Sequence, residues 1–245
     1  MTSRKKNKNN QVLSMQQHLD NFRLNNVSFT EKQKKFFSLC NKKESKITFV
    51  SGPAGSSKTF ISVYTALRFL SQDRDLDLIY VRTIIESAEK GLGALPGDLN
   101  EKFNPYMIPL IEKLNEILPE SNTSKNDLID GGRIEAMPIN FLRGVSWKDK
   151  IVILDEAQNA TFTQIKMFLT RLGNNSTMVI NGDPSQVDLA KSKESGLYET
   201  TKILKDIKEI KTINFDHNDV MRHPLVSKIV KAYDDYEKKE PNGKS

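Results

Sequence analysis

The sequence has a single cysteine, Cys40, and no hydrophobic run long enough to cross a membrane. One cysteine excludes an internal disulfide, and a reducing compartment fits this best. A membrane-spanning helix needs about 18 or more consecutive apolar residues, and no segment approaches that length. The basic start of the chain, MTSRKKNKNNQ, is not followed by the apolar core of a secretion signal. We therefore expect a cytoplasmic protein in which Cys40 packs in the interior.

The chain also lacks internal repeats and any linker rich in Ser and Gly. Its 245 residues are 37% hydrophobic, which suffices for one domain with a sizeable core. The polar ends bury too little apolar surface to order themselves. We expect a flexible basic tail at 1–25, one domain at 26–237 and a second tail at 238–245. Lys and Arg outnumber Asp and Glu by 37 to 31, an excess compatible with nucleic-acid binding but too small to prove it.

Apolar segments of strand length alternate with segments of helical pattern. The expected strands are 46–52, 76–82, 132–139, 150–156, 177–183 and 210–216, and the expected helices are 58–72, 105–119, 162–172 and 194–207. Several of the strands are continuous apolar runs, as expected where both faces of a sheet are covered. The alternation predicts an α/β fold with a mainly parallel sheet sandwiched by helices. Ligands on such sheets bind beyond the carboxyl ends of the strands.

The stretch ITFVSGPAGSSKT joins the first expected strand to the first expected helix, the context in which a glycine-rich match is informative. Its glycines permit a tight loop with inward N–H groups, and the start of the helix adds partial positive charge. Lys58 is expected to reach the terminal phosphates of a nucleotide, and the Thr59 hydroxyl to bind Mg²⁺. The expected phosphate cradle is Gly52, Pro53, Ala54, Gly55, Ser56, Ser57, Lys58 and Thr59.

Ser57 occupies a position where phosphate-binding loops usually have glycine. If the position needs a positive φ, serine costs about 1 kcal/mol, or roughly five- to ten-fold in affinity. Such a cost weakens a phosphate site without abolishing it. The alternative is a glycine-rich turn that carries an incidental lysine.

The expected strand 150–156 ends in Asp155 and Glu156. Carboxylates at the end of a buried strand are costly to desolvate unless positive charge lies near them, and Mg²⁺ would supply it. In the usual arrangement Asp155 holds hydrated Mg²⁺ and Glu156 acts as general base toward the attacking water. The pair therefore favours hydrolysis over simple nucleotide binding. The alternative is acidic residues placed at a helix N-terminus by the helix dipole.

A third strand ends in Asn181, Gly182 and Asp183, and Gln186 follows. These polar groups would face the γ-phosphate if this strand lies between the other two. Gln186 would then sense whether the phosphate is present. The sequence GDPS is also a good turn by itself.

With these blocks in place, the sequence resembles the PhoH-like family, the phosphate-starvation-inducible ATPases of bacteria and many bacteriophages. The resemblance covers nearly all of residues 28–236. It rests on SGPAGSSKT, GLGALPGDLNEKFNPYMIPL, IEAMPINFLRGVSW, LDEAQNATFTQIKMFLTRLG, NGDPSQVDL, SGL and DVMRHPLVSKIVKAYD. It implies a P-loop NTPase with a core similar to that of superfamily 1 helicases, in the stand-alone form found in phages. ATP and Mg²⁺ are the implied cofactors.

The resemblance implies roles for three further residues. Gln33 would read adenine with its amide, and the alternative is a solvated helix residue. Arg171 would contact the nucleotide or simply occupy a helix C-terminus. Arg222 would complete the phosphate site and stabilise the transferring phosphoryl group, with a surface salt bridge as the alternative. If Arg222 acts across an interface, the working form is a ring-like homo-oligomer.

The residues expected to grip nucleic acid depart from the family pattern. Thr83 follows Arg82 where relatives usually have proline, and RGVSW replaces RGRTL. Arg82, Lys90 and Arg143, with Phe141 nearby, would form a phosphate track for RNA or single-stranded DNA, or would simply be solvated.

The sequence offers little else for a ligand. Trp147 is expected to pack rather than to stack on a base. The histidines have no metal-ligand spacing with Cys40 or with one another, so no zinc is expected.

The leading prediction is an Mg²⁺-dependent ATPase with Lys58, Glu156, Gln186 and Arg222 as catalytic residues and Thr59 and Asp155 as metal ligands. One alternative is a nucleotide-gated RNA-binding switch, in which Ser57 slows hydrolysis to a negligible rate. A small-molecule kinase is a weaker alternative, because the sequence shows no lid for an acceptor pocket.

Overall fold

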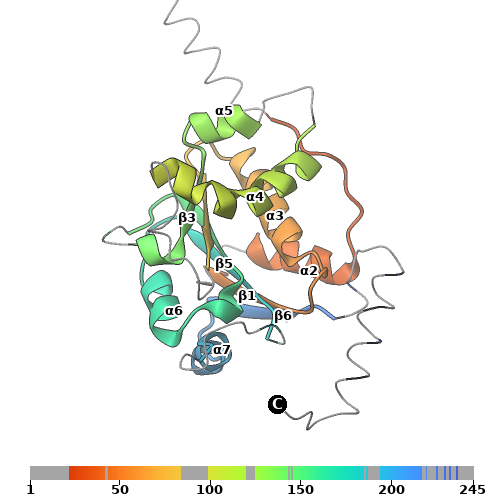
Figure 1. Ribbon diagram of the computed structural model, residues 1–245, viewed down its shortest axis with the longest axis vertical. Helices are drawn as coiled ribbons and strands as arrows, with labels where there is room; N and C mark the ends of the chain where they lie inside the picture. Colours follow the sequence, from red (N-terminus) through yellow and green to blue (C-terminus); the bar gives the residue numbers. More distant parts are fainter. Residues whose placement is uncertain are drawn as a thin grey trace, which may run out of the picture.

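The computed structural model places helices on both faces of a central sheet (Figure 1). It describes residues 22–41, 44–83, 99–119, 125–142, 144, 146–184, 186, 194–216 and 219, and the single residues 225, 229, 232 and 236. The side chains of 99–106 are not among those described. In the described part, no helix is long and apolar enough to cross a membrane.

The sheet has six strands in the order β3-β2-β4-β5-β1-β6, and every neighbouring pair is parallel. The strands are β1 (Ile47–Ser51), β2 (Asp77–Arg82), β3 (Ile134–Pro138), β4 (Lys150–Asp155), β5 (Thr177–Gly182) and β6 (Ile210–Asn214). Each lies within an expected strand segment. The predicted α/β fold with a parallel sheet is thus confirmed.

The helices are α2 (Glu31–Cys40), α3 (Lys58–Leu70), α4 (Leu99–Ile117), α5 (Lys125–Asp130), α6 (Phe162–Leu169) and α7 (Leu197–Leu204), with 3₁₀ turns η2 (Ile139–Phe141) and η3 (Ala157–Asn159). The four expected helices are present. Helix α4 begins earlier than expected, although Pro105 and Pro109 each remove a backbone donor. Helices α2 and α5 were not among the expected helical segments.

Residues along each strand alternate between two hydrophobic layers. Tyr80 and Ile153 pack in one layer with α3 and α4, whereas Val81 and Leu154 pack in the other layer with α6. Burial on both faces explains why the strands read as continuous apolar runs. Phe22, in the segment assigned to the N-terminal tail, is buried in the first layer.

The structure confirms that two further side chains serve packing. Trp147 is 4% exposed and its ring meets that of Phe168 edge-on at 5.2 Å. Cys40 is buried, and burial raises the pKa of its thiol to about 12.

The strand order sets the geometry of the site. Strand β5 lies between β1 and β4, which is the condition stated for Asn181 to face the phosphate site. In the parallel register, Ser51 pairs with Gly182 and Arg82 pairs with Asp155. The glycine-rich loop, the two acids and the polar end of β5 therefore meet at one edge of the sheet.

Candidate active site

The loop between β1 and α3 has the conformation that a phosphate cradle needs. Gly52 lies against the chain after β6, and a Cβ there would come within 2.8 Å of the Phe215 Cβ. Gly55 has a φ of 82°, which a side chain would disfavour. The Ser56 hydroxyl donates to the Pro53 carbonyl at 2.8 Å and closes the turn. The first helical N–H groups of α3 follow directly, so the loop and helix dipole act at the same place.

Ser57 has φ 61° and ψ 24°, in the left-handed region. This position therefore does need a positive φ, as the expected cost of serine required. The resulting strain costs about 1 kcal/mol. Its side chain makes no capping hydrogen bond that would offset this cost. The Ser57 carbonyl accepts the first helical hydrogen bond, from the Ile61 N–H at 2.9 Å.

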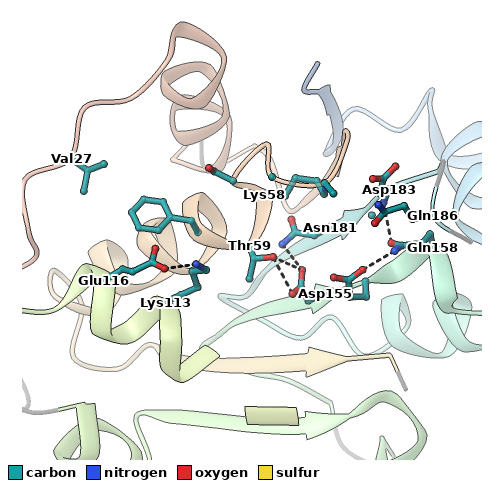
Figure 2. A pocket seen from close by; sticks show the side chains of 16 residues that line it. Val27, Lys58, Thr59, Lys113, Glu116, Asp155, Gln158, Asn181, Asp183 and Gln186 are labelled. Carbon is teal, nitrogen blue, oxygen red and sulfur yellow. Dashed lines mark hydrogen bonds and ion pairs between the residues drawn. The ribbon is translucent and has the colours of Figure 1, made fainter. Parts of the chain in front are cut away.

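Lys58 and Thr59 begin helix α3 and point toward different partners. The Lys58 ammonium donates to the carbonyls of Gly52 and Pro53, at 2.6 and 2.9 Å, and so lies over the loop. The Thr59 hydroxyl lies 3.0 and 3.1 Å from the two carboxylate oxygens of Asp155 (Figure 2). Two segments 96 residues apart in the sequence thus meet in one hydrogen bond.

Asp155 is 3% exposed and is surrounded by neutral donors. Besides Thr59, the Tyr80 hydroxyl donates to it at 2.5 Å and the Asn181 amide at 3.2 Å. Burial, and then the charge of Asp155, raises the pKa of Tyr80 well above 10.0, so the phenol stays a donor. Within the described residues, no lysine or arginine forms an ion pair with Asp155.

The oxygen atoms of Thr59 and Asp155 are suitable ligands for Mg²⁺. This hard cation usually binds one or two protein oxygens and takes its remaining ligands from water and nucleotide phosphates. The Thr59 hydroxyl and the Asp155 carboxylate converge as such a partial set. No group of three or more His, Cys, Asp or Glu side chains capable of holding a metal occurs in the described ranges. The neutral surroundings of Asp155 also suit a carboxylate whose counter-charge arrives with a ligand.

Glu156 lies beside this cluster with φ 56°, a left-handed conformation that is uncommon for glutamate. Its carboxylate accepts a hydrogen bond from the Gln158 amide at 2.7 Å. Its other carboxylate oxygen lies 3.8 Å from the Arg82 guanidinium. The Thr83 hydroxyl donates to the Glu156 carbonyl at 2.6 Å and fixes the backbone.

A cavity of about 540 Å³ joins these groups. Its wall includes the predicted site residues Lys58, Thr59, Asp155, Glu156 and Gln186. The Gln186 N–H donates to the Asp183 carbonyl at 3.0 Å, so the turn reading of GDPS also holds. Val27, Lys113 and Glu116 lie at the other end of the cavity (Figure 2), whose wall also includes Phe60. The cavity thus joins the glycine-rich loop and the two acids at one end to Val27 and the paired Lys113 and Glu116 at the other.

Other predicted residues lie apart from this cavity. Gln33 is fully buried, and its amide oxygen accepts the Thr30 N–H at 2.9 Å in a capping box that starts α2. The Arg171 guanidinium donates to the Leu142 carbonyl at 2.6 Å. Neither residue lines the cavity, so their nucleotide contacts stay predictions. Lys90, Arg143, Arg222 and the three histidines fall outside the described residues.

Sequence reasoning missed several residues of the site. Tyr80 carries no motif, and only the pairing of β2 with β4 brings its hydroxyl to Asp155. Gln158 lies two residues after Glu156 within the DEAQN segment. The sequence therefore placed it near the acids but did not predict its hydrogen bond to Glu156. Lys113 and Glu116 lie on α4, and nothing in their spacing indicated a cavity wall.

Comparison with known proteins assigns the family. The family described as PhoH-like protein matches residues 27–234 of this chain. The chain belongs to the PhoH-like family. The PhoH-like protein of Bacillus subtilis is 46% identical over 192 residues, which cover 78% of this chain and 59% of that protein. Protein PhoH of Escherichia coli is 38% identical over 187 residues, covering 76% of this chain and 52% of that protein.

This PhoH-like chain therefore spans roughly half to three fifths of the length of these curated relatives. Among solved structures, the large terminase of a thermophilic bacteriophage in complex with ATP-gamma-S matches with a TM-score of 0.54. The match covers 83% of this chain and 49% of that one at 12% identity, so it shows a shared fold alone. The P-loop NTPase fold expected from the sequence is confirmed by the family match and the parallel sheet.

Proposed function

We propose that this PhoH-like protein binds ATP with Mg²⁺ and hydrolyses it. We also propose that hydrolysis is coupled to the binding of RNA or single-stranded nucleic acid. The hydrogen bond from Thr59 to Asp155 carries the proposal. It joins the helix that follows the phosphate loop to the acids that end a buried strand. A glycine-rich turn with an incidental lysine would have no reason to meet a buried carboxylate across another strand.

Each residue of the site has a chemical role in this reaction. The loop N–H groups and the Lys58 ammonium bind the phosphates, and Thr59 and Asp155 hold the metal. Mg²⁺, when bound, neutralises charge that develops on the phosphate oxygens. Glu156 orients a water molecule and accepts its proton. Gln186, in the turn after β5, contacts the γ-phosphate.

Phosphate release and nucleotide binding, measured on the same variants, test the proposal. We expect Lys58→Ala to abolish turnover. Because general base catalysis contributes about 10²–10⁴ in rate, Glu156→Gln should lose at least about 100-fold in kcat while ATP still binds. Undiminished turnover in Lys58→Ala would refute the assignment.

The nucleic-acid partner rests on charge and position. The chain carries a formal net charge of +6, and Arg82 lies at the carboxyl end of β2 beside Glu156. Phe141 is 46% exposed, as a stacking residue must be. ATPase assays with RNA and DNA panels test this coupling, and stimulation by neither would remove it from the proposal. Light scattering with and without nucleotide tests the proposed homo-oligomer.

A nucleotide-gated RNA-binding switch is the second candidate, and the left-handed Ser57 favours it. A side chain at Ser57, where the backbone would approach the phosphates closely, would displace them, and a displacement of about 1 Å slows chemistry more than binding. A switch would show tight ATP binding, ATP-dependent RNA affinity and negligible phosphate release. The ATPase would show multiple turnovers under the same conditions.

A further inference from the structure

Gln158 is a buried amide that joins two parts of the site. It is 1% exposed and lies in η3, directly after the strand that carries the acids. Its Nε2 donates to the Glu156 carboxylate at 2.7 Å, and its Oε1 accepts the backbone N–H of Asp183 at 3.0 Å. Figure 2 shows it beside Asp183 at the end of the cavity where Gln186 lies.

The orientation of this amide is fixed by chemistry. A backbone N–H can only donate, so the Gln158 oxygen must face Asp183. The NH₂ group is then forced toward Glu156, where a carboxylate can only accept. Gly182 lies beside this amide, since a Cβ there would be 3.5 Å from the Gln158 Oε1, at ordinary van der Waals contact.

We propose that Gln158 is a positioning residue that sets the place of the general base. Its amide occupies one carboxylate oxygen of Glu156, and the other oxygen, which lies 3.8 Å from the Arg82 guanidinium, is the one that would meet the water molecule. This inference rests on the proposed hydrolysis and goes beyond it, since it assigns the control of Glu156 to a residue that does not react.

The same contacts connect the base with the turn after β5. The Asp183 N–H anchors Gln158, and the Asp183 carbonyl accepts the Gln186 N–H at 3.0 Å. A change at Gln186 when the γ-phosphate leaves would therefore reach Glu156 through the backbone of Asp183 and the side-chain amide of Gln158. The base is well placed only while this turn keeps its shape.

Two variants of Gln158 and one control test the proposal. Gln158→Glu keeps an oxygen for Asp183 but sets a second carboxylate against Glu156. Gln158→Met keeps the approximate length and removes both the donor to Glu156 and the acceptor of the Asp183 N–H. Gln164→Glu is the control, because glutamate suits the N3 position of the capping box that Gln164 forms with Thr161. The measurements are kcat, its pH dependence, the Kd of ATP and thermal unfolding.

We expect Gln158→Met to lower kcat by about 100-fold, the typical cost of a displacement of about 1 Å at a reacting centre. The Kd of ATP should change little. In Gln158→Glu two adjacent carboxylates share a proton, so the acidic limb of the kcat profile should move to higher pH by about one unit or more. Gln164→Glu should match the parent protein in kcat, pH profile and Kd, and its thermal unfolding should change only slightly through loss of the exposed hydrogen bond to Asn140.

Wild-type kcat and pH profile in both Gln158 variants would overturn the inference. So would a fall in kcat matched by an equal loss of ATP affinity, which marks a merely structural residue. If Gln158→Glu does not fold, Gln158→Met alone tests the inference. A loss of kcat that exceeds the change in the Kd of ATP supports a positioning role, and an equal loss of both overturns it. A wild-type protein without ATPase activity would instead overturn the proposed function, so the two failures are distinguishable.

Discussion

The paired strands β2 and β4 carry a carboxylate at each end of the pair, and the surroundings of the two carboxylates differ. At the amino end, Asp77 pairs in register with Lys150 and binds both the Lys150 ammonium and the Arg133 guanidinium. At the carboxyl end, Asp155 pairs in register with Arg82 but is bound by hydroxyl and amide groups. The same two strands thus carry one carboxylate neutralised by the protein and one that is not.

From this difference we infer that Asp77 is structural, whereas Asp155 is the proposed metal ligand. Arg133 also donates to the carbonyls of Leu70 and Leu76, at 3.1 and 2.9 Å, so the Asp77 cluster joins the end of α3 to the sheet. Asp155 is more deeply buried, yet the described residues place no cation in contact with it. A buried carboxylate without a counter-charge is costly, and it persists where a ligand supplies the charge.

The largest expected effect is that of Asp155→Asn on turnover. Changes in the groups that merely orient metal ligands cost 10–100-fold, so loss of a ligand should lower kcat by at least about 100-fold. The free energy of unfolding should change by no more than about 1 kcal/mol, because the hydrogen bonds weakened by loss of the charge are offset by removal of a buried carboxylate that has no counter-charge. Phosphate release and urea unfolding measure the two quantities. A variant that is active but unstable would reverse the roles assigned here.

Asp77→Asn is the matched substitution at the other end and should act on stability. It leaves Lys150 and Arg133 without their carboxylate, at a cost of about 3 kcal/mol for a largely buried pair. Its kcat at a temperature where it is folded should equal that of the parent protein. Equal stability of the two proteins in urea would show that the ion pairs contribute nothing.

Tyr80→Phe removes a charged hydrogen bond from Asp155 and should destabilise the fold by about 2 kcal/mol at neutral pH. The pKa of Tyr80 is raised in the folded state, so the unfolded chain loses this proton first as pH rises. The advantage of the parent protein is therefore full below about pH 10, the ordinary tyrosine pKa, and declines above it. Unfolding curves across this range check the sign. A difference that grows with pH would contradict the assignment.

Ser57→Gly is the smallest expected change. Relief of the left-handed conformation should stabilise the fold by about 1 kcal/mol at most, because glycine also loosens the unfolded chain. The strain is held by the fold itself, so ATP affinity should rise less than the five- to ten-fold expected from sequence.

Asn175→Gly is the control for Ser57→Gly, since Asn175 has a φ of 55° away from the cavity. It should leave ATP affinity unchanged. A ten-fold gain in affinity for Ser57→Gly without a gain in stability would place the strain in binding.

The strands, and the residues that meet at one edge of the sheet, could be predicted because their signals are local. Continuous apolar runs marked β1 and β4, and the glycine loop and the acids directly follow these strands. The expectation that Asn181 faces the phosphate site required β5 to lie between β1 and β4, and the sheet has this order.

The rest depends on contacts between distant segments. Tyr80 reaches Asp155 only through the register of β2 against β4. The capping box that uses the Gln33 amide competes with the predicted role in reading adenine, and sequence alone does not rank the two. The guanidinium of Arg171 similarly turns to a backbone carbonyl that no local pattern identifies.

The most direct test of the central claim is a crystal structure with ATP-gamma-S and Mn²⁺ in place of Mg²⁺, read by anomalous scattering. The account predicts a manganese peak between Thr59 and Asp155, with the terminal phosphate facing Glu156. Ordered nucleotide elsewhere, or a peak away from both oxygens, would contradict it.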